Sequence, residues 1–268
     1  MRIVAVTVHY GNPEFTAQLL RSLELSRKIH KIVCVLHDDF PYRDRFSRVR
    51  YLQFENRGYA AGINRAFRDL IDSGSKAQTV LVMNPDIRIL DEDIAALLAA
   101  HQTSGADCTF PTIREDDLLI HGYRFTALGT MRRVRKEAQF FPGTCFLLNV
   151  AAWEKTGGLA EQYFHYYEDV DFCLRLQRAG CRIHHAGDIV IEHIGKSGAH
   201  FPDTPLPRYA VRNHLLFLRQ LGKLNPLSFA NVSLRHLLYL FRWQRGWHGV
   251  PQWFHGIREF SRTRASRQ

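Results

Sequence analysis

The chain has 268 residues, of which 46% are hydrophobic and 23% are charged, a composition that allows a substantial core and argues against disorder. The five cysteines include no C-x-x-C pair, which argues against a zinc ribbon or a disulfide scaffold and favours a reducing compartment. The formal net charge is +10, from 36 Lys and Arg and 26 Asp and Glu.

Apolar and amphipathic segments alternate along the first part of the chain. Residues 1–10 carry too short an apolar stretch for a signal peptide, and no run of about eighteen apolar residues occurs, so we expect a soluble, cytoplasmic protein. This alternation predicts an α/β fold, a mostly parallel sheet with helices on both faces. The predicted strands are 2–8, 31–36 and 79–84, and the predicted helices are 13–25 with Pro13 in its first turn, 58–72, and 92–101 with Asp91 as its cap.

Polar segments follow each of these strands, at the edge of a parallel sheet where ligands bind. The chain has neither G-x-G-x-x-G after its first strand nor a P-loop sequence, which disfavours simple dinucleotide and P-loop binding. Instead, Asn84-Pro85-Asp86 places a carboxylate directly after a buried strand, a position suited to a divalent metal that holds a diphosphate. The alternative is a turn in which Asp86 bonds to its own backbone.

Three acids, Glu168, Asp169 and Asp171, precede or open a predicted helix over 170–179 that ends at Gly180. They would complement the helix dipole, which is one interpretation. The other is that mutual repulsion and partial burial raise the pKa of at least one carboxyl group, which suits a general base. The sequence leaves both open.

A histidine, His193, ends a short predicted strand over 188–193. A single histidine at a strand end is more often structural than a ligand. Together with Asp86, however, it would suit magnesium or manganese.

The positive charge is concentrated in the last quarter of the chain. Residues 1–203 hold 25 basic and 25 acidic residues, whereas residues 204–268 hold 11 and 1, a difference of 10 that equals the whole net charge. If 206–223 is helical, Arg208, Arg212, Arg219 and Lys223 fall at about 0°, 40°, 20° and 60°, on one narrow face. We expect this face to contact an anionic membrane surface or a lipid diphosphate, and the alternative is a pair of packed helices with solvated charges.

These segments, in this order, resemble family 2 glycosyltransferases of the GT-A fold, and within them the rhamnosyltransferase-like branch. The resemblance covers residues 3 to about 200, with a weaker echo at 208–216 that includes the Arg212-Asn213 pair. Its elements are VTVHYGNPE, ENRGYAAGINRAF, VLVMNPD, FFPGTC, YYEDVDFCLRLQRAG and HIGKS. Each element alone is weak, but their order is specific.

The resemblance implies a Rossmann-like GT-A catalytic domain over residues 1–205 and a basic, aromatic-rich helical extension over 206–268. It implies that Asp169 is the general base of a single displacement with inversion, and that Asp86 and His193 hold Mg²⁺ or Mn²⁺. N-P-D replaces the family's usual D-x-D, so the metal loses one charged anchor. The donor-binding residues that it implies are His9, Tyr10, Asp38, Asn56, Gly58, Asn64 and Asp86.

The expected function is therefore that of an inverting glycosyltransferase in bacterial surface polysaccharide synthesis, such as that of O-antigen. The favoured reaction moves L-rhamnose from dTDP-rhamnose to a saccharide or polyprenyl-diphosphate-linked acceptor, by an enzyme peripheral at the inner face of the membrane. A galactofuranosyl- or other hexosyltransferase is the alternative within the family. A non-catalytic module that binds a polyanion is the alternative of another class, but it needs none of Asp86, Asp169 and His193, so we do not expect nucleic acid as a partner.

Overall fold

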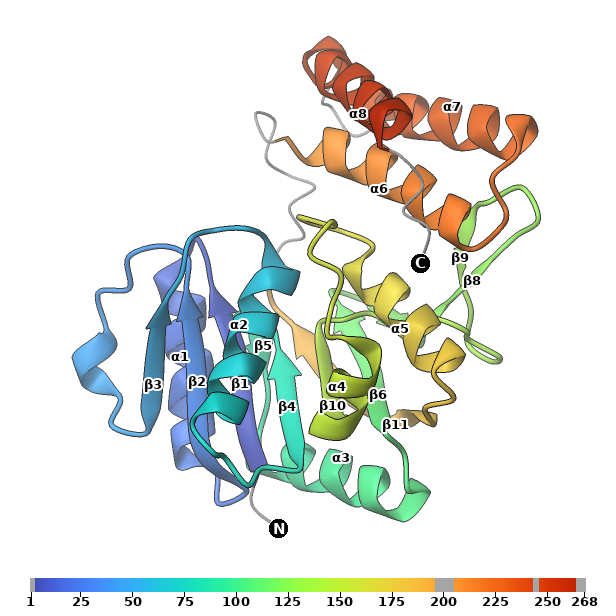
Figure 1. Cartoon of the computed structure of the whole chain (residues 1–268). Helices are drawn as coiled ribbons and strands as arrows, with labels where there is room; N and C mark the ends of the chain where they lie inside the picture. The colour runs from blue at the N-terminus through green and yellow to red at the C-terminus, as the bar shows by residue number, and fades with distance from the viewer. Residues whose placement is uncertain (1–2, 196–204, 243–245, 264–268) are drawn as a thin grey trace. The chain divides into compact units, whose positions relative to one another are not determined.

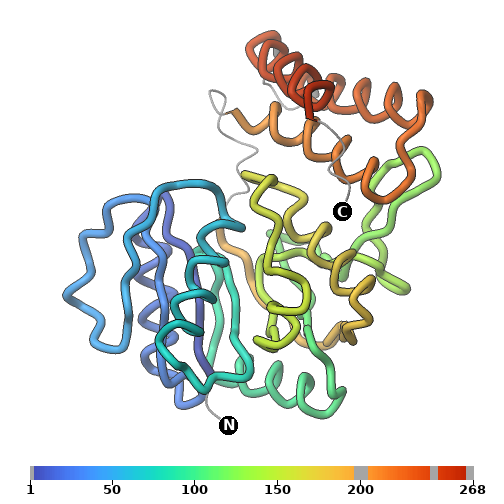
Figure 2. Tube along the Cα trace, viewed as in Figure 1, coloured from blue at the N-terminus to red at the C-terminus, as the bar shows by residue number. Residues whose placement is uncertain are grey.

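The protein is described by a computed structural model that covers residues 3–195, 205–242 and 246–263. The chain, which Figures 1 and 2 colour by residue number, divides into two compact units. The first, here called the sheet domain, comprises residues 3–122, 133–162 and 168–195. The second, here called the helical domain, comprises residues 123–132, 163–167 and the described residues after 204.

A mixed, mostly parallel sheet forms the centre of the sheet domain, in the order β3-β2-β1-β4-β10-β6-β11-β5, with β7 beside β6. Strands β3, β2, β1 and β4 run parallel to one another, and so do β6 and β11, whereas β10 lies between these two groups and is antiparallel to both β4 and β6. The predicted fold class is thereby confirmed. The strands are β1 (Ile3–His9), β2 (Ile29–Leu36), β3 (Val49–Gln53), β4 (Thr79–Met83), β5 (Ile87–Arg88), β6 (Cys108–Glu115), β7 (Leu118–Ile120), β10 (Cys145–Asn149) and β11 (Ile183–His193).

Helices cover both faces of this sheet (Figure 1). Helices α1 (Pro13–Leu25) and α3 (Asp91–Ser104) lie on one face, and α2 (Tyr59–Asp72), α4 (Val150–Thr156) and α5 (Glu168–Arg178) lie on the other. Because of this double cover, every residue of β1 and β4 is buried, which explains their continuous apolar sequences.

The start of α1 agrees with the prediction from its local sequence, whereas the start of α3 does not. Asn12 caps α1 by accepting a hydrogen bond from the Glu14 N–H, and Pro13 occupies the first turn as predicted. Asp91, predicted as a cap, is instead the first residue of α3, and its carboxylate accepts a hydrogen bond from the Ser26 hydroxyl at 2.5 Å. The Asp91 carboxylate thus binds a residue of another segment, Ser26, instead of capping its own helix.

The helical domain consists of three helices and a small hairpin, among the residues described. Helix α6 (Leu206–Gln220) ends before the predicted residue 223, and α7 (Pro226–Arg242) and α8 (Val250–Arg262) follow, the last after a 3₁₀ turn (Gly246–Gly249). Strands β8 (Tyr123–Phe125) and β9 (Met131–Arg133) form the hairpin. None of the described helices is long and apolar enough to cross a membrane.

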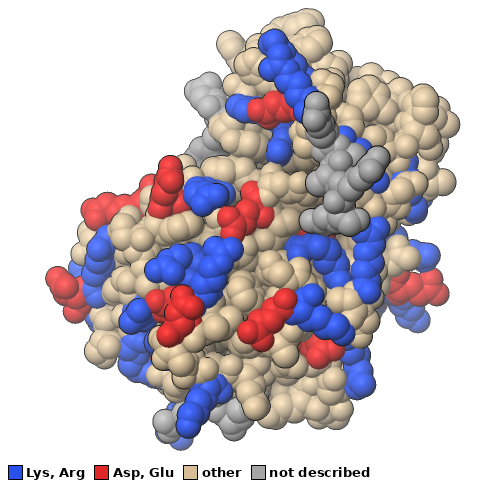
Figure 3. Space-filling view, in the orientation of Figure 1, with Lys and Arg blue, Asp and Glu red and all other residues tan. Residues whose placement is uncertain are grey.

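The charge of the two domains differs as the sequence indicates. Over the part of the sheet domain that Figure 3 shows, basic and acidic side chains are interspersed rather than segregated. This agrees with the balance of 25 basic and 25 acidic residues in 1–203. The excess charge therefore belongs to the helical domain.

Candidate active site

His9, the last residue of β1, is buried within the sheet domain. Its side chain is 0% exposed, with Nδ1 2.7 Å from the Thr16 hydroxyl and Nε2 3.1 Å from the Asp39 carbonyl oxygen. Burial lowers its pKa and thereby favours the neutral imidazole. The imidazole thus ties α1 to the loop after β2, and both of its nitrogens have protein partners rather than facing the predicted donor.

Asp38 and Tyr10 flank the same loops. One carboxylate oxygen of Asp38 accepts a hydrogen bond from the Gly11 N–H at 2.9 Å, and Gly11 has a positive φ of 82° that a side chain would strain. Tyr10 is 63% exposed. The structure therefore brings the predicted residues at the ends of β1 and β2 together, with Tyr10 available to a ligand.

Gly58 and Asn56 shape the start of α2. Gly58 is the N-cap of the helix with a φ of 96°, and its N–H donates to the Asn56 side-chain oxygen at 3.1 Å. Since Gly58 has no side chain, it does not cap the first-turn N–H groups of α2. Helix starts of this kind attract anions.

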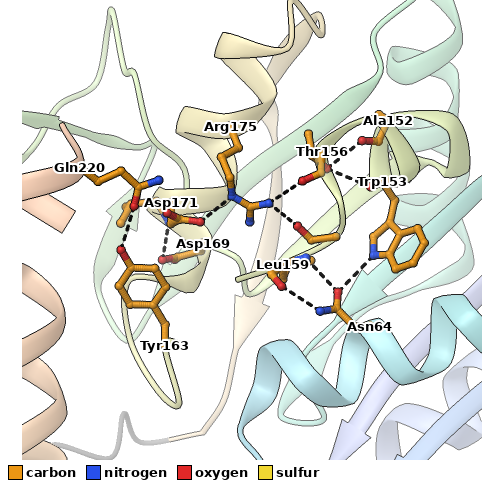
Figure 4. Close-up of polar contacts among 12 residues, drawn as sticks. Asn64, Ala152, Trp153, Thr156, Leu159, Tyr163, Asp169, Asp171, Arg175 and Gln220 are labelled. Atoms are coloured by element: carbon orange, nitrogen blue, oxygen red, sulfur yellow. Dashed lines mark hydrogen bonds and ion pairs between the residues drawn. The ribbon is translucent and has the colours of Figure 1, made fainter. Parts of the chain in front are cut away.

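Asn64 has an internal role that the sequence did not reveal (Figure 4). It is 1% exposed, and its oxygen accepts hydrogen bonds from the Leu159 N–H at 2.8 Å and the Trp153 indole at 3.2 Å. Its amide nitrogen donates to the Leu159 carbonyl at 2.8 Å and to Glu161 at 3.0 Å. Asn64 therefore fastens α2 to the segment after α4, and these bonds use both of its polar atoms.

Asp86 and His193 come together where β4 ends and β11 ends. His193 pairs with Ile87 in the β11–β5 ladder, which brings its Nε2 to 3.1 Å from Oδ2 of Asp86. Oδ1 of Asp86 is buried without a hydrogen-bond partner. Burial lowers the pKa of His193, but the carboxylates of Asp86 and Glu115 outweigh this effect and raise it to about 9.

Glu115 completes this cluster and was missed from the sequence. It ends β6, opposite His193 in the parallel β6–β11 pair, and its Oε1 lies 2.9 Å from Nδ1 of His193. A carboxylate on the second ring nitrogen fixes the orientation of a metal-binding histidine. Gly195 is also needed, because a Cβ at that position would collide with Oδ2 of Asp86.

These residues fit the predicted divalent metal through two protein ligands. Oδ1 of Asp86 is an unpartnered oxygen ligand, and Nε2 of His193 faces Oδ2 of the same carboxylate. No group of three or more His, Cys, Asp or Glu side chains is arranged so as to hold a metal ion by itself, among residues 3–195, 205–242 and 246–263. The remaining ligands would therefore be diphosphate oxygens and water, as magnesium usually requires.

Asp169 lies in the first turn of α5 and is held by backbone donors. Its Oδ2 accepts a hydrogen bond from the Gly143 N–H at 3.0 Å and its Oδ1 accepts one from the Val170 N–H at 2.8 Å. Burial raises its pKa and these bonds oppose the rise. A Cβ at Gly143 would lie 2.7 Å from Cβ of Asp169, so glycine is required for this approach.

The two neighbouring acids have different environments. Burial and the charge of Asp169 raise the pKa of Glu168 to about 8, and its Oε2 is buried without a hydrogen-bond partner. Asp171 is 0% exposed and pairs with Arg175 at 2.7 Å (Figure 4). Arg175 also donates to the carbonyls of Thr156 and Gly158 at 2.8 and 2.6 Å, so Asp171 has a structural role.

Tyr59, also missed from the sequence, connects the two acidic sites. Its hydroxyl lies 3.5 Å from the carbonyl oxygen of Gly143, whose N–H binds Asp169. Burial is the largest cause that raises the pKa of Tyr59 well above its ordinary value. The charges of neighbouring groups, which include Glu168, Asp169 and Asp86, raise it further. One buried phenol thus lies within electrostatic range of both the candidate base and the candidate metal ligand.

The cations predicted to face a membrane are used inside the helical domain instead. Arg208 pairs with Glu259 of α8, with Nε 2.9 Å from Oε2, and Arg212 lies 3.8 Å from the same carboxylate. Arg219 donates to the Thr263 carbonyl at 2.8 Å and lies over the Phe260 ring, and Lys223 donates to the Phe125 carbonyl at 3.3 Å. The packing alternative therefore describes α6, and this cationic stripe is not an open surface.

Comparison with known proteins places these observations in context. A family model described as glycosyl transferase family group 2 matches residues 108–253. The chain is 31% identical over 160 residues to the low-salt glycan biosynthesis hexosyltransferase Agl10 of Haloferax volcanii, a match over 55% of this chain and 49% of that protein. It therefore spans about half of that relative.

A second relative and a solved structure cover more of the chain. The N-acetylglucosaminyl-diphospho-decaprenol L-rhamnosyltransferase of Mycobacterium tuberculosis is 32% identical over 220 residues, which are 66% of this chain and 70% of that protein. The mannosyltransferase PcManGT of Pyrobaculum calidifontis, solved with GDP-Man and Mn²⁺, superposes with a TM-score of 0.59. That match has 13% identity and covers 98% of this chain and 76% of the other, so it supports the GT-A fold alone.

Proposed function

Because this chain belongs to glycosyl transferase family group 2, we propose that it transfers a sugar from a nucleoside-diphosphate donor to an acceptor hydroxyl with inversion at the anomeric carbon. The favoured donor is dTDP-rhamnose, and the favoured acceptor is a saccharide linked to a polyprenyl diphosphate, in bacterial surface polysaccharide synthesis. The family resemblance identified from the sequence is confirmed. The donor, the acceptor and the pathway are proposals.

Two relatives support different donors. The Mycobacterium tuberculosis relative is named as an L-rhamnosyltransferase that acts on N-acetylglucosaminyl-diphospho-decaprenol. This name supports rhamnose as the donor sugar and a lipid-linked acceptor for the present chain. The name of the Haloferax volcanii relative states only a hexosyltransferase, and it supports the alternative of another hexose, galactofuranose included. Pocket shape separates such donors, and a single methyl or hydroxyl group is enough to change the preference.

One observation carries the enzymatic proposal. Asp86 has a buried, unpartnered oxygen beside His193, and the Glu168–Asp169 pair lies within electrostatic range of Tyr59 together with Asp86. A module that only binds a polyanion has no use for buried carboxylates, because like charge repels its ligand. The cluster is instead suited to a metal-bound diphosphate on one side and a general base on the other.

The chain's own residues divide the reaction between them. A bound Mg²⁺ or Mn²⁺ would neutralise the departing diphosphate, with Asp86 and His193 as its protein ligands. Asp169 accepts the proton of the acceptor hydroxyl while that oxygen forms a bond to the anomeric carbon and the bond from that carbon to the diphosphate oxygen breaks. The electron pair of the broken bond leaves with the nucleoside diphosphate, and attack on the face opposite that leaving group inverts the anomeric carbon.

Asp169 is better suited to this role than Glu168. Its two backbone N–H donors stabilise the ionised form, whereas Glu168, with a pKa of about 8, is mostly protonated near neutral pH. Because the Glu168 carboxyl is mostly protonated near neutral pH, it repels an ionised Asp169 only weakly.

The proposed location is the inner face of the cell membrane, where a polyprenyl-linked acceptor would be found. This placement depends on the lipid-linked acceptor, and the excess of ten positive charges in residues 204–268 supports it.

A panel of nucleotide sugars tests the proposal. Thermal shift and isothermal titration calorimetry with dTDP-rhamnose, UDP-galactofuranose, UDP-GlcNAc and GDP-mannose, each with and without Mn²⁺, should show a metal-dependent response to dTDP-rhamnose. A response to another donor would replace the rhamnose assignment and leave the transferase proposal standing. No response to any donor, combined with tight binding of single-stranded DNA, would favour the non-catalytic module.

A further inference from the structure

Helix α7 is apolar on two opposite sides. Val232 and Leu240 are 1% and 3% exposed and pack inside the helical domain. On the other side, four apolar side chains are largely exposed, and at 100° per residue they lie within about 60° of one another. They are Leu227 (66%), Leu234 (55%), Leu238 (57%) and Phe241 (43%), here called the α7 stripe. On a surface helix, the side turned away from the core is normally polar, so an exposed apolar row is unusual.

Trp247 extends the stripe beyond the helix. It is 78% exposed, and its ring lies 5.2 Å from the Phe241 ring in an edge-to-face contact. Single exposed apolar residues are ordinary, but a contiguous row that ends in an exposed tryptophan marks a binding surface.

The charges of the helical domain indicate what this surface binds. Arg235 on α7 and Arg258 and Arg262 on α8 are exposed. The single acid of residues 204–268 is Glu259, and it is already paired with Arg208. The exposed side chains of this segment therefore combine leucine, aromatic rings and arginine, and its one acidic side chain, Glu259, is neutralised by Arg208.

We propose that the α7 stripe and Trp247 insert into an anionic lipid leaflet, with the exposed arginines against its headgroups. Interfacial protein segments combine an apolar face of this kind with basic residues, and tryptophan favours the headgroup level. The inference deepens the proposed function, since it assigns the surface at which a lipid-linked acceptor is met.

Other occupants fit the surface less well. A second copy of the chain would bring two arginine-rich surfaces together without compensating acids. Nucleic acid would use the arginines and stack on the aromatic rings, but it has no hydrocarbon to cover four adjacent aliphatic and aromatic side chains on one helix face. A leaflet meets both requirements.

Vesicle co-sedimentation with the full chain tests the proposal. The parent protein should bind vesicles of equal parts phosphatidylcholine and phosphatidylglycerol more tightly than vesicles of phosphatidylcholine alone. The double variant Leu234→Gln/Leu238→Gln should bind the mixed vesicles about tenfold or more weakly, because two leucine side chains no longer enter hydrocarbon. The matched control is Leu25→Gln, since Leu25 is 79% exposed on α1 of the sheet domain and should have no effect.

A second readout keeps the test independent of folding. Brominated lipids should quench part of the tryptophan fluorescence of the parent, and Trp247→Phe should remove that part. Circular dichroism and calorimetric donor binding in solution should be the same for parent and variants, which separates this inference from the proposed transferase function.

Several outcomes would overturn the proposal. Parent protein that ignores both kinds of vesicle would exclude a leaflet, even if donor binding persists and the transferase function stands. A double variant that sediments with vesicles like the parent would exclude the α7 stripe. Self-association that the double variant abolishes, seen by sedimentation velocity without lipid, would assign the surface to a second copy.

Discussion

At the scale of single residues, the chemistry depends most on Asp86. In the proposed reaction its unpartnered oxygen would be one of two protein ligands of the metal, and Asn84 stands where the family usually has the first acid of its motif. Asp86→Ala should therefore abolish metal-dependent binding of a nucleoside diphosphate. His193→Ala should weaken it less, because Nε2 of His193, with a pKa raised to about 9, must lose a proton before it can bind the metal, whereas the carboxylate of Asp86 binds a hard cation directly. Calorimetry with and without Mn²⁺ measures both effects.

Asp117→Asn is a suitable control, because Asp117 is an exposed acid in the turn after β6. It should bind metal and nucleotide like the parent. If Asp86→Ala also keeps the full Mn²⁺ dependence, the metal lies elsewhere and the role given to His193 falls with it.

The neighbouring carboxyl groups Glu168 and Asp169 should respond differently to amide substitution. Asp169→Asn keeps the shape and removes the proton acceptor, so sugar transfer should fall by about 10²–10⁴ while donor affinity survives. Glu168→Gln mimics a carboxyl group that is already protonated near neutral pH, so transfer should change only a few-fold. Initial rates and donor dissociation constants for both variants test the division of roles. The reverse ranking would transfer the role of base to Glu168.

At the scale of secondary-structure elements, the buried pair His214–His236 links α6 and α7. Nδ1 of His214 lies 3.0 Å from Nε2 of His236, and Nε2 of His214 lies 2.7 Å from the Gly129 carbonyl oxygen. The carbonyl can only accept, so His214 donates from Nε2 and accepts from His236 at Nδ1. Both rings are therefore neutral, and burial lowers their pKa values to about 3 and about 4.

This pair should make the helical domain sensitive to acid. The unfolded chain binds protons below about pH 6.5 and the folded pair does not, so stability is complete above that pH and falls as pH drops toward 4. Each buried neutral histidine costs about 1.4 kcal/mol per pH unit in this window. Urea unfolding at about pH 7.5 and about pH 5, followed by tryptophan fluorescence, should show a smaller difference for His236→Gln than for the parent.

The glutamine can still donate to His214, so a folded variant is expected. His248→Gln is the matched control, because His248 is exposed and should leave the pH dependence unchanged. An unchanged slope in His236→Gln would show that the acid sensitivity arises from other groups.

Local signals in the sequence predicted β1, β2 and β4 and helices α1, α2, α3 and α5 closely, but β3, β6 and β10 were not predicted, and long-range partners could not be read from the sequence. Pro13 and the β-branched run of β1 act within one element, so their patterns suffice. Glu115 lies 78 residues from His193, and only the pairing of β6 with β11 makes them neighbours. Arg208 and Glu259 are 51 residues apart, so the helical wheel of α6 placed the cations on one face but could not show that α8 covers it.

The candidate site divides in the same way. Asp86, His193 and Asp169 were identified because their residue types stand in specific motifs at strand and helix ends. Asn64 was also identified, but its hydrogen bonds to the segment after α4 are set by tertiary packing. Tyr59 and Gly143 carried no local signal of chemistry, since their importance comes from lying beside Asp169 and its neighbours.

At the scale of the whole molecule, the net charge of +10 belongs to residues 204–268 and the apolar α7 stripe lies in the same segment. Two physical terms should therefore hold the protein on an anionic membrane. The electrostatic term is screened by salt, since the Debye length falls from about 10 Å at 0.1 M to about 3 Å at 1 M. The apolar term is not weakened by salt, because it depends on the area removed from water.

Salt titration should separate these terms. Binding of the full chain to vesicles of phosphatidylcholine and phosphatidylglycerol should fall as NaCl rises and level off at a residual fraction. Arg258→Glu/Arg262→Glu should lower binding at low salt and leave that residual fraction, whereas Leu234→Gln/Leu238→Gln should lower the residual fraction most. Co-sedimentation across a series of NaCl concentrations measures both curves. If the two variants shift the curve in the same way, charge and apolar insertion are not separate terms, and the arginines and the α7 stripe do not face the leaflet together.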